Sequence, residues 1–380
     1  MSERTAVVAG GGIGGLAAAL ALHRRGWDVE VLERAPAFGE VGAGISLWAN
    51  GVRALEALGV GRAVRDRSMP EREAGIREPG GRWLSRADTG ALERRHGSVV
   101  VLHRAHLLDL LREALPERML RTGAEVRAVR RAGERVEVEH TGGVSRADLV
   151  VGADGIGSAV RRSVWPDAPG PRYAGYTVWR AVIDPGRPLR AGGETWGRGR
   201  RVGLVSLPDG RVYMFCVADA PAGGRAPDGE PAELGRLFSG WHAPIPELLA
   251  AAPEDAFVRH DIHELPPLRT YVSGRVALLG DAAHAMTPNL GQGGNQALED
   301  AVTLAALLDR HPAVERALAA YDRERRPRTQ MIARRSRWIG EATRWSSPLA
   351  VAARNTLIRL TPASAMPRAL APVLDWRPPT

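Results

Sequence analysis

The glycine pattern near the N-terminus constrains the fold more than any other feature of this sequence. Gly10, Gly12 and Gly15 follow a short apolar run and open a stretch with helical apolar spacing. Val29–Leu32 forms the next apolar run, and Glu33 ends it. In a β-α-β unit such glycines permit a tight turn, let a pyrophosphate approach the backbone and let the helix pack closely on the strand. An acid at the second strand end binds ribose hydroxyls. The stretch therefore predicts a site for an ADP-containing ligand.

Two later stretches also place glycine and aspartate after an apolar run. "VVGADGIGSAVR" (Val150–Arg161) predicts a strand, an Asp-Gly turn and a helix with Ser158 as a possible N-cap. "GDAAHAMTPNLGQGGNQALED" (Gly280–Asp300) follows another apolar run. There Asp281 could accept hydrogen bonds from sugar hydroxyls, and the glycines after it lead into a helix whose free amides could bind an anion. The alternative is structural, with Asp281 capping a turn and His284 satisfied within the fold.

The middle of the chain has a different texture. From about Tyr173, "GYTVWRAVI", "GETWGRGRRVGLVSLP" and "GRVYMFCVAD" are β-rich segments separated by Gly, Pro and Asp-Gly turns. These segments predict an antiparallel sheet. Around Leu268 the chain returns to apolar runs typical of a parallel sheet, and it ends in a long helix and a tail with several prolines.

Composition excludes several chemistries. The 380 residues contain one cysteine, Cys216, so neither an internal disulfide nor a cysteine-rich metal site is expected. No lysine is present, which excludes a Walker-type phosphate lysine and a Schiff base. The net charge of +9 favours anionic partners such as nucleotide phosphates. The densest cationic run, Tyr321–Trp338, also carries acids at helical spacing, so we expect a solvated helix face and no nucleic-acid partner.

The targeting features point to a cytoplasmic protein. The chain opens on a strand-like segment rather than an apolar signal region, and no apolar run reaches eighteen residues. We therefore expect no integral membrane segment. "PLAVAARNTLIRL" (Pro348–Leu360) could touch a membrane surface, but its arginines favour packing against the core or a dimer partner. We expect a monomer or a homodimer.

The three glycine-aspartate stretches, in this order and spacing, resemble the single-component FAD-dependent aromatic hydroxylases, the group typified by p-hydroxybenzoate hydroxylase. Salicylate hydroxylases, urate hydroxylases and tetracycline-inactivating oxygenases are similar. Asp154-Gly155 and Gly280-Asp281 with "TPNLGQGGNQALEDA" carry most of the resemblance. "EVGAGISLWANG" (Glu40–Gly51) and "LHRAHLLDLL" (Leu102–Leu111) are similar to further family segments, and together they cover nearly the whole chain.

The resemblance implies an α/β fold, in which a Rossmann-like FAD-binding domain carries an inserted antiparallel β-sheet substrate domain and a C-terminal helical segment. The expected bounds are 1–72, 97–170 and 268–325 for the FAD-binding domain, 73–96 and 171–267 for the substrate domain, and 326–380 for the helical region.

The resemblance also implies the cofactor contacts. Glu33 would bind the adenosine ribose, Val126 the adenine, Arg104 the phosphate–ribitol region and Asp281 the ribitol. Pro288 would face the flavin, with the amides that follow it at the flavin pyrimidine edge. The expected FAD-binding residues are Gly10, Gly12, Gly14, Gly15, Glu33, Arg34, Gly44, Ser46, Arg104, Val126, Asp154, Asp281, Pro288, Gly291, Gly293, Gly294 and Asn295.

The implied reaction is hydroxylation of an aromatic or heteroaromatic small molecule. In the family, NAD(P)H reduces FAD, oxygen forms a flavin C4a-hydroperoxide, and its distal oxygen attacks the substrate. Arg201 and Tyr213 resemble an Arg/Tyr pair that contacts the substrate in urate-hydroxylase relatives. Asn289 stands where those relatives carry an acid, and this departure bears on whether urate is the substrate.

Other functions on this fold remain open from the sequence. A halogenase would need a pocket lysine and a Trp-x-Trp-x-Ile-Pro segment, and this chain has neither. An FAD-dependent epoxidase or reductase of an isoprenoid or polyketide is compatible with the glycine motifs. So is a non-catalytic flavin-containing small-molecule binder. NADH and NADPH cannot be told apart, because the family has no separate nicotinamide domain.

Overall fold

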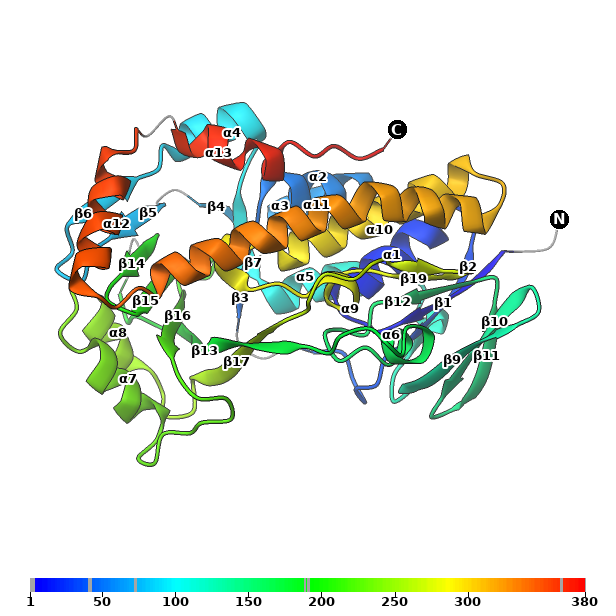
Figure 1. The fold of residues 1–380 in the computed structure, drawn as a ribbon, viewed down its shortest axis with the longest axis horizontal. Helices are drawn as coiled ribbons and strands as arrows, with labels where there is room; N and C mark the ends of the chain where they lie inside the picture. The colour runs from blue at the N-terminus through cyan, green and yellow to red at the C-terminus, as the bar shows by residue number, and fades with distance from the viewer. Residues whose placement is uncertain are drawn as a thin grey trace.

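A six-stranded sheet lies in the larger part of the molecule (Figure 1). The structure is a computed structural model that describes residues 4–39, 43–71, 74–187, 189, 192–362 and 365–379. The strand order is β18-β19-β12-β1-β2-β8, with all neighbours parallel except the β18–β19 pair. The bounds are β1 Thr5–Ala9, β2 Asp28–Leu32, β8 Leu120–Arg121, β12 Leu149–Gly152, β18 Val272–Ser273 and β19 Val276–Leu278.

The parallel register brings the three sequence motifs together. β1, β12 and β19 are neighbours, and each of the three glycine-aspartate stretches follows one of them. Because the carboxyl ends of parallel strands lie at one edge of a sheet, the motifs meet there. Helix α1 (Ile13–His23) packs on the sheet and on α10 (Gly293–Arg310), and α5 (Arg104–Glu113) packs beside α1.

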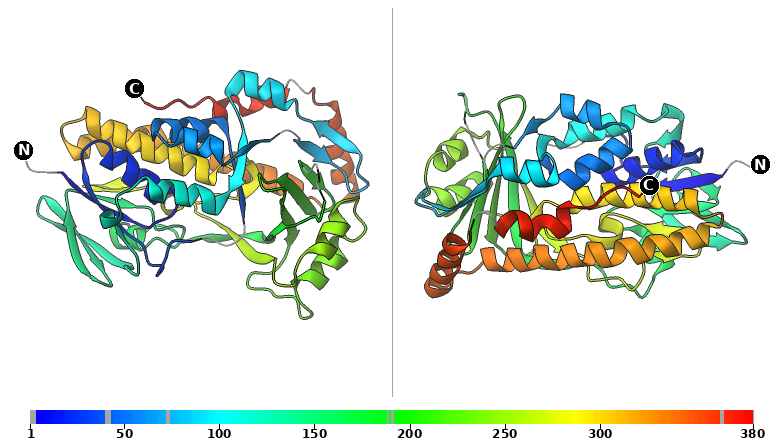
Figure 2. Two further views of the ribbon diagram at one scale, coloured as in Figure 1. Left: turned by 180° about the vertical axis from the view of Figure 1, so that it is seen from behind. Right: turned by 90° about the horizontal axis from the view of Figure 1, so that it is seen from above.

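A seven-stranded sheet stands at the other end of the molecule (Figure 2). Its order is β17-β13-β16-β15-β14-β5-β6, and only the β14–β5 pair is parallel. The predicted antiparallel sheet is therefore present. The bounds are β5 Gly75–Arg77, β6 Trp83–Arg86, β13 Arg172–Ile183, β14 Glu194–Trp196, β15 Arg200–Ser206, β16 Val212–Asp219 and β17 Val258–Glu264.

Two smaller sheets and several short helices complete the fold. Two three-stranded sheets comprise β3 Gly44–Leu47, β4 Met69–Pro70 and β7 Val100–His103, and β9 Val126–Ala132, β10 Arg135–His140 and β11 Gly143–Ala147. The shorter helices are α2 Ala49–Ala57, α3 Gly61–Asp66, α4 Thr89–His96, η1 Glu117–Met119, α6 Ala159–Val164, α7 Glu230–Phe238, α8 Ile245–Ala251, α9 Asp281–His284 and η2 Pro288–Leu290.

Three helices form the C-terminal part. α11 (Val314–Thr343) runs from the six-stranded sheet to the seven-stranded sheet, as both figures show. α12 (Pro348–Leu360) then lies at the end of the molecule, and α13 (Ala365–Leu374) returns to pack against α4. No helix in the described parts of the chain is long and apolar enough to cross a membrane.

Helix α12, which the sequence predicted to pack against the core or a dimer partner, docks on the protein through polar residues. Its buried residues are Arg354 and Asn355, while Leu349, Leu357 and Leu360 are exposed by 68% or more. Arg354 donates to the carbonyl oxygens of Gly197 and Thr343, at 3.1 and 3.3 Å. The helix is therefore held by backbone acceptors that bind its cation, and packing of its exposed leucines on a dimer partner stays a prediction.

Candidate active site

The first strand end is a close-packed glycine turn. Gly10 adopts φ +102°, and its amide donates to the carbonyl of Leu32 at 2.8 Å. A Cβ on Gly15 would lie 1.9 Å from the Gly10 carbonyl oxygen, so only glycine lets α1 approach β1 this closely. A Cβ on Gly12 would meet nothing within 4 Å. The turn therefore leaves open space at the N-terminus of α1, where the sequence predicts a pyrophosphate.

Glu33 holds this turn in place. Its carboxylate accepts from the amides of Gly11 at 2.6 Å and Ala35 at 2.8 Å. The sequence predicted ribose binding for this acid, and the structure adds a positioning function for the glycine turn. Arg34 beside it is exposed, and Val126 is buried at the start of β9.

Asp154 follows the second strand end and caps the next helix. Its Oδ2 accepts from the amides of Ala159 at 2.7 Å and Val160 at 3.1 Å, and Ser158 caps the same helix through Arg161. Oδ1 of Asp154 is buried and has no partner among the described residues. A buried unpaired acceptor costs free energy, and this oxygen is free to accept from a bound group.

Asp300 holds the end of the third strand, β19, in place. Its carboxylate accepts from the Gly280 amide at 3.0 Å, lies 2.6 Å from His284 Nε2 and accepts from Arg325 at 2.7 Å. Burial alone would raise the pKa of Asp300, but His284 and Arg325 lower it to about 2. His284 is thus held through Nε2 by Asp300, as the alternative interpretation expects, but its Nδ1 is buried without a partner among the described residues. Asp281 itself is exposed.

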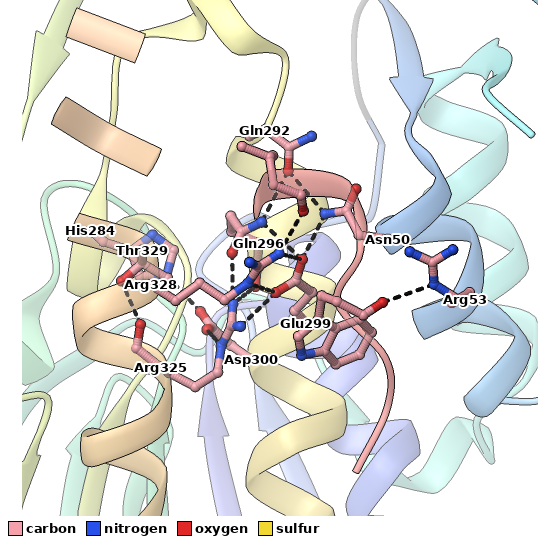
Figure 3. A network of polar contacts seen from close by, with 12 residues as sticks. Asn50, Arg53, His284, Gln292, Gln296, Glu299, Asp300, Arg325, Arg328 and Thr329 are labelled. Atoms are coloured by element: carbon pink, nitrogen blue, oxygen red, sulfur yellow. Dashed lines mark hydrogen bonds and ion pairs between the residues drawn. The ribbon is translucent and has the colours of Figure 1, made fainter. Parts of the chain in front are cut away.

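A buried ionic network ties the N-terminal half of α10 to α11 and α2 (Figure 3). Glu299 accepts from Arg325 at 2.5 Å, from Arg328 at 2.7 Å and from Asn50 at 2.6 Å. Arg325 is fully buried between Glu299 and Asp300. The acids of the "ALEDA" segment therefore position the start of α10 rather than contacting a ligand.

Asn295 has a similar positioning function. Its Oδ1 accepts from the Trp48 amide at 3.1 Å, and its Nδ2 donates to the carbonyls of Ser46 at 3.3 Å and Gly291 at 2.9 Å. The side chain is fully buried. Asn295 thereby joins β3 to the first turn of α10.

One large cavity, of about 1030 Å³, lies between the strand ends and the seven-stranded sheet. It brings together most of the predicted residues, which are Gly12, Gly14, Gly44, Ser46, Arg104, Arg201, Tyr213, Asp281, Pro288, Asn289, Gly291, Gly293 and Gly294. Among the described residues, the lining leaves out Gly10, Gly15, Glu33, Arg34, Val126, Asp154 and Asn295.

Arg201 is the buried cation of the cavity. It is 3% exposed, donates to Asn289 Oδ1 at 2.8 Å and lies 3.4 Å from Glu194. Its Nε is buried without a partner among the described residues. Asn289 is itself fixed, since its Nδ2 donates to the Ser336 carbonyl at 2.9 Å. A guanidinium in a cavity wall suits an oxygen-bearing ligand.

Tyr213 lies on the same face of the sheet as Arg201, with Phe215 between them. Arg201 is paired with Val217, two residues beyond Phe215, so their side chains share a face. The Phe215 ring lies across Gly203, where a Cβ would be 2.0 Å from the ring. The Tyr213 hydroxyl accepts from Arg180 at 2.9 Å.

Three acids in the cavity, Glu71, Glu93 and Glu194, were missed from the sequence. Glu194 on β14 accepts from Arg201 and from the Trp196 indole, the latter at 2.6 Å. Glu71 follows β4, where its amide donates to the Val99 carbonyl at 3.1 Å. Burial raises the pKa of Glu71 to about 7, against a hydrogen bond from Ser46. The period-two row Tyr213-x-Phe215 could have revealed Phe215, whereas no local pattern marks Glu71.

The residues present fit a dinucleotide cofactor. Two helices, α1 and α10, point N-terminal turns without side-chain caps at the cavity, through Gly12, Gly293 and Gly294. Such termini offer amide donors and a positive dipole end to anionic groups. The open space at Gly12 is a further feature that a ligand would fill. Among the described residues, no cluster of His, Cys, Asp or Glu could hold a metal ion.

Comparison with known proteins agrees with this geometry. Residues 3–336 match the family described as FAD binding domain. The chain belongs to this family. It is 41% identical to the aurachin C monooxygenase/isomerase of Stigmatella aurantiaca, over 94% of each chain. It is 36% identical to the 2-heptyl-3-hydroxy-4(1H)-quinolone synthase of Pseudomonas aeruginosa, also over 94% of each.

A solved structure extends the match to three dimensions. Klebsiella pneumoniae HpxO complexed with FAD and uric acid superimposes with a TM-score of 0.91 at 32% identity, covering 98% of this chain and 96% of the other. The protein is therefore an FAD-dependent aromatic hydroxylase that uses FAD as cofactor and NAD(P)H as co-substrate. The relatives are monooxygenases and hydroxylases, which favours hydroxylation over the epoxidase, reductase and binder alternatives.

Proposed function

We propose that the hydroxylase acts on a planar aromatic or heteroaromatic ring that carries a carbonyl, phenolic or anionic oxygen, held by Arg201. The observation that carries this proposal is the buried guanidinium of Arg201 in the cavity wall, with one acid at 3.4 Å. A substrate oxygen would complete the hydrogen bonds of Arg201 and offset its charge. Relatives whose names include urate and quinolone support such a ring.

The other wall residues would orient the ring. Phe215 offers an aromatic face between Tyr213 and Arg201, and Gly203 makes room for it. Asn289 would hold the guanidinium in one direction, because it accepts from Arg201 while bonded to Ser336. Asn289 is neutral, so the charge of Arg201 is balanced only by Glu194 at 3.4 Å among the described residues, and an anionic or strongly polarised oxygen is favoured.

On the cofactor side, we propose that the amides at the start of α1 bind the FAD pyrophosphate, and that Glu33 and Val126 lie along its adenosine. Arg104 and Asp281 would bind the phosphate–ribitol part. The start of α10 would face the flavin with free amides from Gly293 and Gly294. FAD supplies the redox and oxygen chemistry when bound, and the chain supplies position, charge and exclusion of water.

The remaining expectations stay predictions. These are the three-part domain division at 72/73, 96/97, 170/171, 267/268 and 325/326, a cytoplasmic location, a monomeric or homodimeric state and the absence of a nucleic-acid partner.

Arg201→Gln tests the proposal. The variant keeps hydrogen-bond donors but removes the charge, so a ring bearing an anionic oxygen should bind at least tenfold more weakly. FAD-loaded protein would be assayed for NADH and NADPH oxidation with quinolones, purines, hydroxybenzoates and phenols, with peroxide measured alongside. We expect a compound that accelerates oxidation at low peroxide in the wild type and at high peroxide in the variant.

Arg200→Gln is the matched control. Arg200 is exposed and donates to the Leu237 carbonyl, on the opposite face of β15 from Arg201. It should behave as wild type. Equal coupling of NAD(P)H use to hydroxylation in both variants would remove Arg201 from the substrate site.

A further inference from the structure

The lining of the cavity changes from polar to apolar along the seven-stranded sheet. Its floor runs through cross-strand neighbours, from Phe215 on β16 past Glu194 on β14 to Ile76 on β5. β5 lies two strands from β15, which carries Arg201, and strands are spaced by about 4.8 Å, so the apolar end begins roughly 10 Å from the cation.

Beyond β5 the wall is made of aliphatic and thioether side chains. They come from β5, α4, α11, α13 and the loop after α9, which are far apart in the sequence. α4 and α13 lie together at one edge of the molecule, away from β15 and β16 (Figure 1). We call this part of the cavity the apolar arm, lined by Ile76, Leu92, Met286, Ile339, Met366 and Leu370.

Most of these side chains are only partly covered by protein. Leu92 is buried, but the other five keep part of their surface accessible although they face a cavity. Covering apolar surface is worth about 25 cal/mol per Å². A ligand that covers these side chains would therefore gain affinity from burial alone.

The C-terminal end of α13 is held by Val373 and Leu374, which are buried in a small apolar cluster with Ile332 that Leu370 partly joins. α13 is also fixed by polar contacts, where His96 lies 2.9 Å from the Pro367 carbonyl and Arg328 donates to the Val373 carbonyl at 2.6 Å. The sides that carry Met366 and Leu370 are left to face the cavity.

The arm offers few partners to a polar group. Two acids of the cavity lining border it. Glu194, the cross-strand neighbour of Ile76, already accepts from Arg201 and Trp196, and Glu93 on α4 is exposed and accepts from Ser98 at 2.8 Å. The six lining side chains provide only C–H and sulfur atoms, and methionine adapts to ligand shape. A sugar, phosphate or carboxylate would lose its hydration there without replacement.

We infer that the apolar arm binds an alkyl or isoprenoid chain carried by the substrate ring. This inference rests on the proposed function, since the ring would be held by Arg201 and the chain would extend past β5 between α4 and α13. A chain of about five carbons or more is needed to reach into the arm across two strand spacings. The substrate class is thus an aromatic ring with an oxygen at one end and a long apolar substituent at the other.

A homologous series of 4-alkylphenols, from methyl to heptyl, tests the inference. Binding to FAD-loaded protein is followed by the change in flavin absorbance. We expect the dissociation constant to fall two- to fourfold per methylene until the arm is full, as expected for burial of apolar groups. Leu370→Asp should abolish this dependence and leave 4-methylphenol binding within twofold of wild type. Leu357→Asp, the same change at an exposed position of α12, is the control.

Leu370→Phe tests the same position if the Leu370→Asp variant misfolds. It adds apolar atoms to the arm, so affinity should stop rising at a shorter chain. Affinity that is independent of chain length in the wild type, or unchanged by both Leu370 variants, would overturn the inference.

A chain-bearing fluorophore separates the two proposals. If no phenol binds, the ring site fails for phenols, and binding of dansyl-labelled undecanoic acid decides about the arm. Fluorescence enhancement with wild type and with Leu357→Asp, but not with Leu370→Asp, supports the arm. No enhancement with any of these proteins overturns it.

Discussion

At the scale of single residues, the buried acid Glu71 gives the cavity a pH dependence. Desolvation raises its pKa to about 7, partly offset by the hydrogen bond with Ser46. Because the folded-state pKa lies above the unfolded value, the folded protein binds the proton more tightly. The resulting stability is fully present below about pH 4.5 and is lost as the pH rises through about 7.

Glu71→Gln is expected to remove this dependence. Glutamine resembles the protonated acid, so the variant should match wild type at pH 5 and exceed its unfolding free energy at pH 8 by about 1–3 kcal/mol. Urea unfolding at the two pH values measures the difference. Glu71→Asp keeps the carboxyl group and should retain a pH dependence, and parallel curves for wild type and Glu71→Gln would contradict the burial argument.

Several residues that the sequence proposed for one site line one cavity in the structure, and their functions stay predictions. Arg201, Tyr213 and Asn289 were expected in one site, and the structure places all three in the same cavity. Glu71 was not predicted as a site residue, because its place in the cavity depends on the pairing of β4 with β7, which no local pattern reveals. The hydrogen bond from the Gly11 amide to Glu33 was likewise not predicted, since the two residues meet only once the turn has folded.

At the scale of elements, the three strand ends were predictable. Apolar runs followed by glycine and aspartate indicate parallel strands, and neighbouring parallel strands end at one edge. The structure confirms this for β1, β12 and β19. The packing of α12 was not predictable, because its docking site is a set of carbonyls from residues such as Gly197 that only the fold assembles.

The α10–α11 contact depends on one buried cation. Arg325 neutralises Glu299 and Asp300, and all three side chains are fully buried. Arg325→Met would leave two buried carboxylates short of a partner, so we expect a loss of about 3–5 kcal/mol in unfolding free energy. Thermal and urea unfolding of the FAD-loaded protein would measure it.

Arg326→Met is the neighbouring comparison. Arg326 pairs with Asp322 at 3.1 Å on a partly exposed side of the same helix, and its loss should cost no more than about 1 kcal/mol. Similar losses for the two variants would show that burial of the network does not set its contribution.

At the scale of the whole molecule, the cavity is where the layers meet. Its lining takes residues from the seven-stranded sheet, from the loops that follow β1, β12 and β19, and from α4, α10, α11 and α13. A cofactor bound there would contact elements that otherwise touch mainly at their edges. FAD at a hundred times its dissociation constant should therefore raise the unfolding free energy by about 2.7 kcal/mol, and its removal should lower the melting temperature.

Gly12→Asp separates cofactor binding from folding. Space around Gly12 is open, and aspartate suits the N-cap of α1, so the apoprotein should melt at or slightly above the wild-type temperature. The new carboxylate would occupy the place predicted for the pyrophosphate and repel it, so the FAD-induced rise should vanish. Thermal melts with and without FAD measure both effects. A retained rise would move the pyrophosphate away from α1, whereas a lower melting temperature of the apoprotein would mean that the turn itself needs glycine at this position.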